Sequence, residues 1–229
     1  MRLAILSDIH EDYSSLRKLL EKAESRGFDK LICLGDISGF SLPYYTYGES
    51  RNAPACLALL REKCQILIAG NHDIHAAGRD PELHESMKSQ EAWPHQQDLD
   101  PGYSEEDISF LVSLPFYETL ATPAGNILFS HYVYPNLSGF VQGFYQKAKQ
   151  FRGHFSFMRQ RDCSLGFSGH AHPEGFYRVN SRGFRLYRKR EITITSFPAL
   201  IGIPPVTRHE QRSSFCIFDT VSLRLQIIR

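Results

Sequence analysis

Residues 2–10 read RLAILSDIH, and the pattern in this stretch recurs along the chain. Arg2 to Ser7 is a short apolar run of strand length, and Asp8 and His10 follow it directly. Four further clusters also place polar residues after apolar runs: Gly35-Asp36, Gly70-Asn71-His72-Asp73, Ser130-His131 and Gly169-His170-Ala171-His172. Carboxylates, amides and imidazoles that gather at the ends of several strands can hold a pair of divalent metals.

The first part of the chain predicts alternating strands and helices. Tyr13 to Gly27 carries apolar residues at helical spacing before a terminal glycine, and Leu31 to Leu34 is strand-like. Ala53 to Cys64 repeats the helical pattern, and Gln65 to Ala69 supplies a third buried strand. In such parallel arrangements ligands gather beyond the carboxyl ends of the strands. The sequence places Asp8, Asp36 and Asn71 there.

The rest of the chain is rich in short strands. Residues 104–107 resemble a helix-capping box, and the helix that follows is expected to end at Pro115. The strands expected after it are 117–121, 127–129, 164–168, 176–179, 184–187, 192–195, 214–218 and 223–228. This order predicts two packed sheets with helices outside, an α/β sandwich. Because ligand residues from Asp8 to His172 must meet in one site, residues 1–229 are expected to form a single domain.

The composition argues against some partners. The chain has 26 Lys and Arg against 25 Asp and Glu, a formal net charge of +1, so no global field for capturing nucleic acid is expected. One basic segment, residues 178–190, fits the exposed face of a hairpin better than a nucleic-acid site. No apolar run approaches the 18 residues that could span a bilayer, which predicts a soluble protein with no membrane partner.

The five cysteines indicate a reducing compartment. Their number is odd, no Cys-x-x-Cys pair occurs, and their apolar neighbours suit buried free thiols. Residues 2–7 are expected to form the strand that leads to Asp8, so they are not expected to belong to a signal peptide. These features together predict a cytoplasmic protein.

The identity and order of the five clusters resemble the calcineurin-like metallophosphoesterases. The pattern of that family runs Asp-x-His, Gly-Asp, Gly-Asn-His-Asp or Glu, His, and then Gly-His-x-His, and the match spans residues 8–172. The resemblance implies a four-layer α/β/β/α sandwich of two mixed β-sheets flanked by helices. It also implies that the protein hydrolyses a phosphate ester.

Two neighbouring metals need one ligand that bridges them, and a carboxylate with two oxygens can do this. Asp36 is the expected bridge. The resemblance implies that Asp8, His10 and His172 complete the first metal site and that Asn71, His131 and His170 complete the second. Oxygen and nitrogen ligands without a thiolate are compatible with two divalent ions of Mn, Fe, Zn, Co or Ni. Such a pair would lower the pKa of a shared water towards roughly 7 and polarise phosphoryl oxygens.

His72 follows a ligand residue and would lie near the metals without binding them. In the family that the chain resembles, this histidine faces the substrate and either stabilises the transition state or protonates the leaving oxygen. The resemblance implies that role for His72. Asp73 either orients His72 or a metal-bound histidine, or caps a helix.

Two departures from the family patterns bear on the substrate. The Gly-Asp-x-x-Asp-Arg-Gly signature of the serine/threonine protein phosphatases is absent; residues 35–40 read GDISGF, a form that resembles the small prokaryotic-type phosphoesterases. Those proteins tend to have Asn-Pro-Gly-Ser-Val-Gly and then Pro-Arg after the last ligand motif, whereas residues 197–202 read FPALIG here. Substrate contacts from that loop are therefore in doubt, and Arg208 is a candidate replacement.

Two stretches, residues 38–52 and 79–102, lack clear periodicity, and each follows a ligand cluster. Such loops either contact the substrate or are plain surface insertions. The aromatic residues between Phe140 and Phe157 are interleaved with lysines and arginines. They either stack a base or pack into a core.

The sequence as a whole predicts a cytoplasmic, dinuclear metal hydrolase. Its expected partner is a small phosphate-ester substrate, with a phosphodiester or nucleotide-like compound ahead of a monoester. One alternative is a non-catalytic, metal-binding scaffold on the same fold. Such chains typically lack the histidine that corresponds to His72 or some of the metal ligands, whereas this chain has all of them. Another is a nuclease, for which a larger basic channel or an accessory domain would be expected. The oligomeric state does not follow from the sequence.

Overall fold

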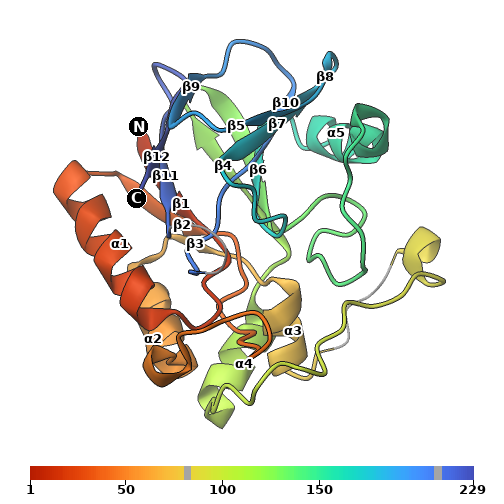
Figure 1. Ribbon diagram of the computed structural model, residues 1–229. Helices are drawn as coiled ribbons and strands as arrows, with labels where there is room; N and C mark the ends of the chain where they lie inside the picture. Colours follow the sequence, from red (N-terminus) through yellow and green to blue (C-terminus); the bar gives the residue numbers. More distant parts are fainter. Residues whose placement is uncertain (80–83, 209–212) are drawn as a thin grey trace.

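The computed structural model describes residues 1–79, 84–208 and 213–229, and within these ranges the strands form two mixed sheets (Figure 1). The strands of the first sheet are β1 (Arg2–Leu6), β2 (Lys30–Cys33), β3 (Ile66–Leu67), β9 (Glu191–Thr193), β11 (Phe215–Asp219) and β12 (Arg224–Ile228). Those of the second are β4 (Tyr117–Thr122), β5 (Gly125–Ser130), β6 (Cys163–Ser168), β7 (Phe176–Asn180), β8 (Gly183–Tyr187) and β10 (Ala199–Gly202). Their spatial orders are β3-β2-β1-β11-β12-β9 and β4-β5-β6-β10-β7-β8.

Helices lie outside both sheets (Figure 1). On the side of the first sheet are α1 (Tyr13–Arg26) and α2 (Ala53–Lys63), and on the side of the second is α5 (Arg152–Arg159). Two further helices, α3 (Asn71–Ala76) and α4 (Glu105–Ser113), lie near the end of β3. Short 3₁₀ turns are η1 (Gly48–Ser50), η2 (Glu85–Met87) and η3 (Ala148–Phe151).

The alternation of side chains along β1 explains the layers. Leu3 and Ile5 pack in the core between the two sheets, together with Phe167 of β6. Ala4 and Leu6 point to the other face and pack in the core under α1 and α2. Since β1 pairs in parallel with β2 and antiparallel with β11, the first sheet is mixed. The α/β/β/α sandwich of two mixed sheets is therefore confirmed.

Residues 197–202 were compared with a substrate-contacting loop of the small prokaryotic-type phosphoesterases, and substrate contacts from this stretch were in doubt; the structure shows that most of it is a strand. Ala199–Gly202 form β10, which pairs in parallel with β6 and antiparallel with β7. All four residues are buried, so the stretch lacks the alternation of apolar and polar residues that predicts a half-exposed strand. Pro198 also directly precedes it. Helices α3 and α5 were also not predicted. The chain therefore adds a central strand where a substrate-contacting loop was considered.

Several local predictions are confirmed. Ser104 Oγ accepts a hydrogen bond from the Asp107 backbone N–H at 3.2 Å, and the Asp107 carboxylate accepts one from the Ser104 N–H at 3.0 Å, which completes the capping box of α4. β7 and β8 form the basic hairpin, with Arg182 and Arg185 exposed. The five cysteines are free thiols. None of the helices in the described part of the chain combines the length and the apolar character needed to cross a membrane.

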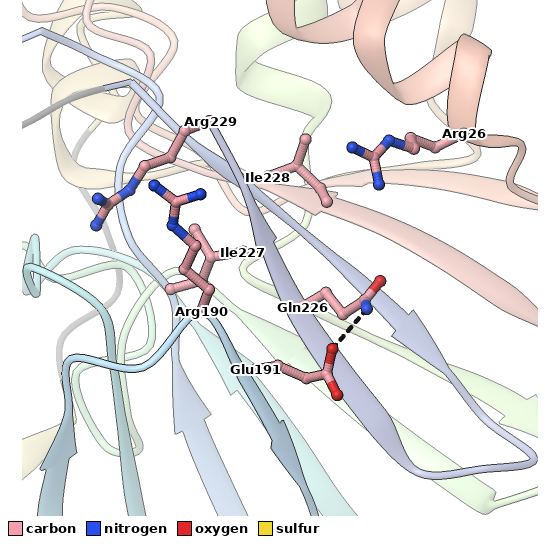
Figure 2. A pocket seen from close by; sticks show the side chains of 7 residues that line it. All are labelled: Arg26, Arg190, Glu191, Gln226, Ile227, Ile228 and Arg229. Atoms are coloured by element: carbon pink, nitrogen blue, oxygen red, sulfur yellow. Dashed lines mark hydrogen bonds between the residues drawn. The ribbon is translucent and has the colours of Figure 1, made fainter.

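The two irregular stretches largely remain without regular structure, apart from η1 and η2, and residues 80–83 of the second lie outside the described residues. Near the β9 edge of the first sheet, Arg26, Arg190 and Arg229 line a small pocket of about 210 Å³ beside β12 (Figure 2). All three are exposed. This surface pocket is separate from the polar clusters described next.

Candidate metal centre

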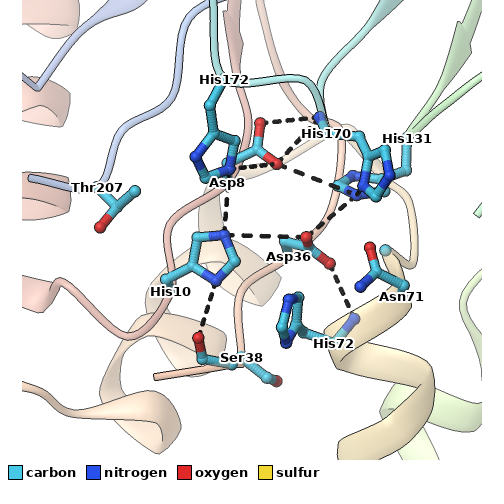
Figure 3. A network of polar contacts seen from close by, with 12 residues as sticks. Asp8, His10, Asp36, Ser38, Asn71, His72, His131, His170, His172 and Thr207 are labelled. Carbon is cyan, nitrogen blue, oxygen red and sulfur yellow. Dashed lines mark hydrogen bonds and ion pairs between the residues drawn. The ribbon is translucent and has the colours of Figure 1, made fainter. Parts of the chain in front are cut away.

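The predicted ligand residues follow the ends of five strands and meet in one place (Figure 3). β1 leads to Asp8, β2 to Asp36, β5 to His131 and β6 to His170, while Asn71 is the first residue of α3 after β3. All five side chains are buried. The sheet edges thus bring together residues that are far apart in the sequence.

The backbone at the site adopts a conformation that side chains normally avoid. Five of the predicted ligand residues have positive φ angles: Asp8 (57°), His10 (46°), Asp36 (53°), His170 (62°) and His172 (40°). Such left-handed residues are uncommon outside glycine and cluster at functional sites. The strand ends therefore turn sharply in order to aim these side chains at a common point.

Two glycines allow the strand ends to approach one another. A Cβ atom on Gly70 would collide with the Asp36 carboxylate, and one on Gly169 would collide with Ser7 and Asp8. Any larger residue would displace one of the two buried carboxylates. The glycines before the ligands are therefore required by close packing.

Two groups of ligand atoms result. In the first, His172 Nε2 lies 3.3 Å from Asp8 Oδ1 and 3.3 Å from His10 Nε2. In the second, His131 Nε2 lies 3.1 Å from Asp36 Oδ2 and 3.2 Å from His170 Nδ1. Asp36 Oδ2 is also 3.9 Å from His10 Nε2, so this carboxylate faces both groups. Each group keeps its donor atoms within 4.8 Å of one another, which suits one cation per group.

The Asn71 side chain lies beside the second group (Figure 3). Its Nδ2 donates to His95 Nε2 at 3.0 Å, which fixes the orientation of the amide. Its Oδ1 is buried and has no hydrogen-bond partner. An unpaired buried carbonyl oxygen is costly unless a water donates a hydrogen bond to it or a cation binds it. A hard oxygen donor next to carboxylate and imidazole ligands fits a divalent metal.

Backbone carbonyls select the ligating nitrogen of two histidines. His10 Nδ1 lies 3.0 Å from Gly39 O, and His131 Nδ1 lies 2.8 Å from Leu34 O. Because a carbonyl oxygen can only accept, each Nδ1 carries a proton and each Nε2 remains available as a ligand. In both residues Nε2 is the atom that faces the group.

The charges in the site are strongly coupled. Burial would raise the pKa of Asp8, but His172 and His131 lower it to about 2. Burial would lower the pKa of His131, but the Asp36 and Asp8 carboxylates raise it to about 9. An imidazole with such a pKa must release a proton before its Nε2 binds a cation, so metal affinity should rise with pH.

His72 lies beside the ligands and has its own carboxylate partner. Its backbone N–H donates to Asp36 Oδ1 at 3.0 Å, which places the ring next to the bridging position. Its Nδ1 lies 2.5 Å from Asp98 Oδ2. Burial would lower the pKa of His72, but Asp36 and Asp98 raise it. A protonated imidazole is thereby stabilised at the edge of the site.

Asp73 hydrogen bonds to the backbone. Its Oδ2 accepts from the Gly70 N–H at 3.0 Å, and its Oδ1 accepts from the Ile37 and Ser38 N–H groups at 2.9 and 3.0 Å. The residue therefore caps α3 and ties it to the turn that carries Asp36. Of the two roles considered for it, this geometry corresponds to the helix cap.

Two polar residues at the site were not predicted from the sequence, and a third, Arg208, has a partner that was not expected. Asp98 contacts His72, and His95 contacts Asn71. Both belong to one turn, in which the Asp98 N–H donates a hydrogen bond to the His95 carbonyl at 3.0 Å. Neither was predicted, because this polar run has no motif or periodicity. The Arg208 guanidinium donates to Asp12 at 2.8 and 3.0 Å, so its described ion pair is with the N-cap residue of α1.

Comparison with known proteins agrees with this geometry. Residues 1–174 match the family described as calcineurin-like phosphoesterase, and the chain belongs to this family. It is 24% identical over 245 residues to the uncharacterized protein MJ0912 of Methanocaldococcus jannaschii, covering 99% of this chain and 86% of the relative. The fold is similar to that of a metallophosphoesterase from Sphaerobacter thermophilus (TM-score 0.69, 20% identity, 100% and 87% of the two chains). It is also similar to a structure described as a novel archaeal phosphodiesterase (TM-score 0.50, 13% identity, 100% and 99%).

Proposed function

We propose that this protein is a dinuclear metal hydrolase that acts on a phosphodiester or nucleotide-like ester in preference to a simple monoester. Membership in the family makes it a phosphoesterase that uses divalent metal. The observation that supports two ions is the position of the Asp36 carboxylate, 3.1 Å from His131 in one group and 3.9 Å from His10 in the other. One carboxylate that faces two groups is what a bridged pair of cations needs.

The chain would divide its residues between holding ions and moving a proton. In this proposal Asp8, His10 and His172 hold the first ion, Asn71, His131 and His170 hold the second, and Asp36 bridges them. The bound ions would supply an activated water and electrophilic stabilisation of the phosphoryl oxygens. His72 would donate a proton to the leaving oxygen, with Asp98 keeping its ring oriented and protonated.

The preference for a larger ester rests on the loops. Residues of the stretches 38–52 and 79–102 pair with each other through a bridge between Ser41 and Asp98, which lies directly beside His72. Both stretches therefore border the site, where loops commonly contact the substrate. The similarity in fold to an archaeal phosphodiesterase is in line with a diester substrate.

We also propose that residues 1–229 act as one domain, because the site draws on residues 8 to 172. We further propose that the protein is cytoplasmic, because its five cysteines are free thiols, which fit a reducing compartment.

Metal analysis followed by turnover tests this proposal. After reconstitution with Mn or Zn, elemental analysis should give two ions per chain, and bis-p-nitrophenyl phosphate should be hydrolysed in a chelator-sensitive reaction. A metal content near zero would refute the dinuclear proposal. Two bound ions without turnover on mono- or diesters would favour the scaffold alternative.

A further inference from the structure

Two aromatic side chains beside His170 reach the surface. Trp93 and Phe144, here called the aromatic wall, have ring centroids 5.2 Å from the His170 ring and 5.6 Å from each other. Phe144 is 43% exposed and Trp93 is partly exposed. Two adjacent exposed aromatic rings next to a candidate metal ligand form an apolar surface at the proposed site.

The aromatic wall is held in place by the backbone. The Trp93 N–H donates to the Phe140 carbonyl at 2.7 Å, and an isolated bridge joins Ala92 to Val141. The Gln142 side-chain amide also donates to the Ala92 carbonyl at 2.9 Å. Hydrogen bonds thus join the segment that carries Trp93 to the segment that carries Phe144. A flat group could dock here without first ordering the loop.

The packing of His170 does not by itself account for the aromatic wall. Tyr132 is buried and its ring lies 4.7 Å from the His170 ring, so it already supports the imidazole from the protein interior. Gly139 approaches the same ring closely enough that a Cβ atom would lie 2.6 Å from it. Trp93 also lines a cavity of about 290 Å³ with His95 and Phe140, so its indole is not enclosed in the core. Part of each aromatic side chain is therefore exposed and left for another contact.

We propose that the aromatic wall stacks a nucleobase of the substrate, and that Trp93 and Phe144 determine specificity for a nucleotide ester. The inference rests on the proposed function, because it needs the phosphate to lie at the metal centre. A base is separated from its 5′-phosphate by one sugar, so a surface that contacts the His170 ring is within its reach. Aromatic side chains stack on any base, and each such contact can strengthen binding several-fold to more than a hundredfold.

Binding of two phosphate monoesters to the metal-loaded protein tests the inference. Adenosine 5′-monophosphate should bind about 5- to 150-fold more tightly than ribose 5-phosphate, because only the former carries a base. Phenyl phosphate serves as a third probe, since an affinity equal to that of the nucleotide would show that a simple aryl ester is preferred and would overturn the nucleobase assignment. Trp93 is the single tryptophan of the chain, so its fluorescence should change with the nucleotide and not with ribose 5-phosphate.

Matched variants separate stacking from packing. Phe144→Leu and Trp93→Leu keep apolar bulk without an aromatic ring, and each should reduce the affinity ratio towards one. Trp93→Phe should restore most of it. Phe197→Leu is the control, because Phe197 is 40% exposed but lies in a different pocket with Asn126 and Phe155.

An unchanged ratio in both leucine variants, or equal affinity of the wild type for nucleotide and ribose 5-phosphate, would refute the stacking role. Continued hydrolysis of bis-p-nitrophenyl phosphate in that case would leave the proposed function intact. If no phosphate compound binds and no ester is hydrolysed, both proposals fail.

Discussion

Replacing Asp98 by asparagine should slow the hydrolysis of esters with poor leaving groups without removing metal. Asp98 Oδ2 lies 2.5 Å from His72 Nδ1, and the two side chains are only 10% and 12% exposed, so water screens the pair weakly. A hydrogen bond with a charged partner contributes about 1.5–3 kcal/mol. Since about 1.4 kcal/mol corresponds to a tenfold change in rate, the expected loss in kcat is about 10- to 150-fold. Asparagine retains an acceptor oxygen, which favours the lower end.

The assay compares two diesters on the metal-loaded variant. The loss should be large for an alkyl ester and small for bis-p-nitrophenyl phosphate, because a good leaving group needs little protonation. Elemental analysis should still give the wild-type metal content. Asp100→Asn is the control: Asp100 lies in the same loop, is exposed, and accepts its described side-chain hydrogen bond from the Gly102 N–H. Equal losses on both esters, or loss of an ion, would refute the positioning role of Asp98.

Three further changes probe the ligands, the proton donor and a buried histidine away from the site. Asp36→Asn should lower both metal content and turnover, because it weakens the oxygen bridge between the two groups; unchanged metal content in elemental analysis would count against the bridge. His72→Ala should keep both ions while turnover of poor-leaving-group esters falls roughly 10²- to 10⁴-fold, and a lost ion would show that His72 is a ligand. Burial lowers the pKa of His154 from 6.5 to about 3. Between these two pH values His154 is therefore protonated in the unfolded chain and neutral in the native protein. The contribution of His154 to the free energy of unfolding should therefore fall as the pH drops from 6.5 towards 3, by at most about 1.4 kcal/mol per pH unit. His154→Gln should remove this contribution from the slope measured in urea titrations, and the exposed His84→Gln should leave the slope unchanged.

The strand ends carry most of what could be predicted about the site. α1 begins at Tyr13 as expected, because Asp12 accepts a hydrogen bond from the Ser15 N–H and caps it, and Gly27 follows its end. Motifs placed directly after apolar runs can be assigned to the edge of a sheet, since the position of a strand fixes the position of the residue that follows it. The grouping of Asp8 with His172, which are far apart in the sequence, needed only this rule and the family pattern.

Residues that act through loop contacts could not be predicted in this way. Asp98 reaches His72 because the Leu99 N–H donates to the Phe40 carbonyl at 2.9 Å and because Asp98 bridges to Ser41. Both contacts join two irregular stretches whose local sequences contain no strand or helix pattern. β10 was missed for a related reason, since a strand buried on both faces shows no alternation. In each case tertiary packing, rather than local preference, fixes the conformation.

The left-handed residues explain why the ligand motifs occur at these strand ends and depend on one another. Each such residue costs roughly 1–3 kcal/mol, so an isolated turn of this kind would relax. Here the turns stabilise one another: the Asp8 N–H donates to the Gly35 carbonyl at 2.9 Å, and the His10 N–H donates to the Asp36 carbonyl at 3.0 Å. The His170 N–H in turn donates to the Asp8 carboxylate at 3.0 Å. Because three strand ends share these bonds, the protein holds the ligand atoms in position through its own backbone, and a cation would find them already oriented.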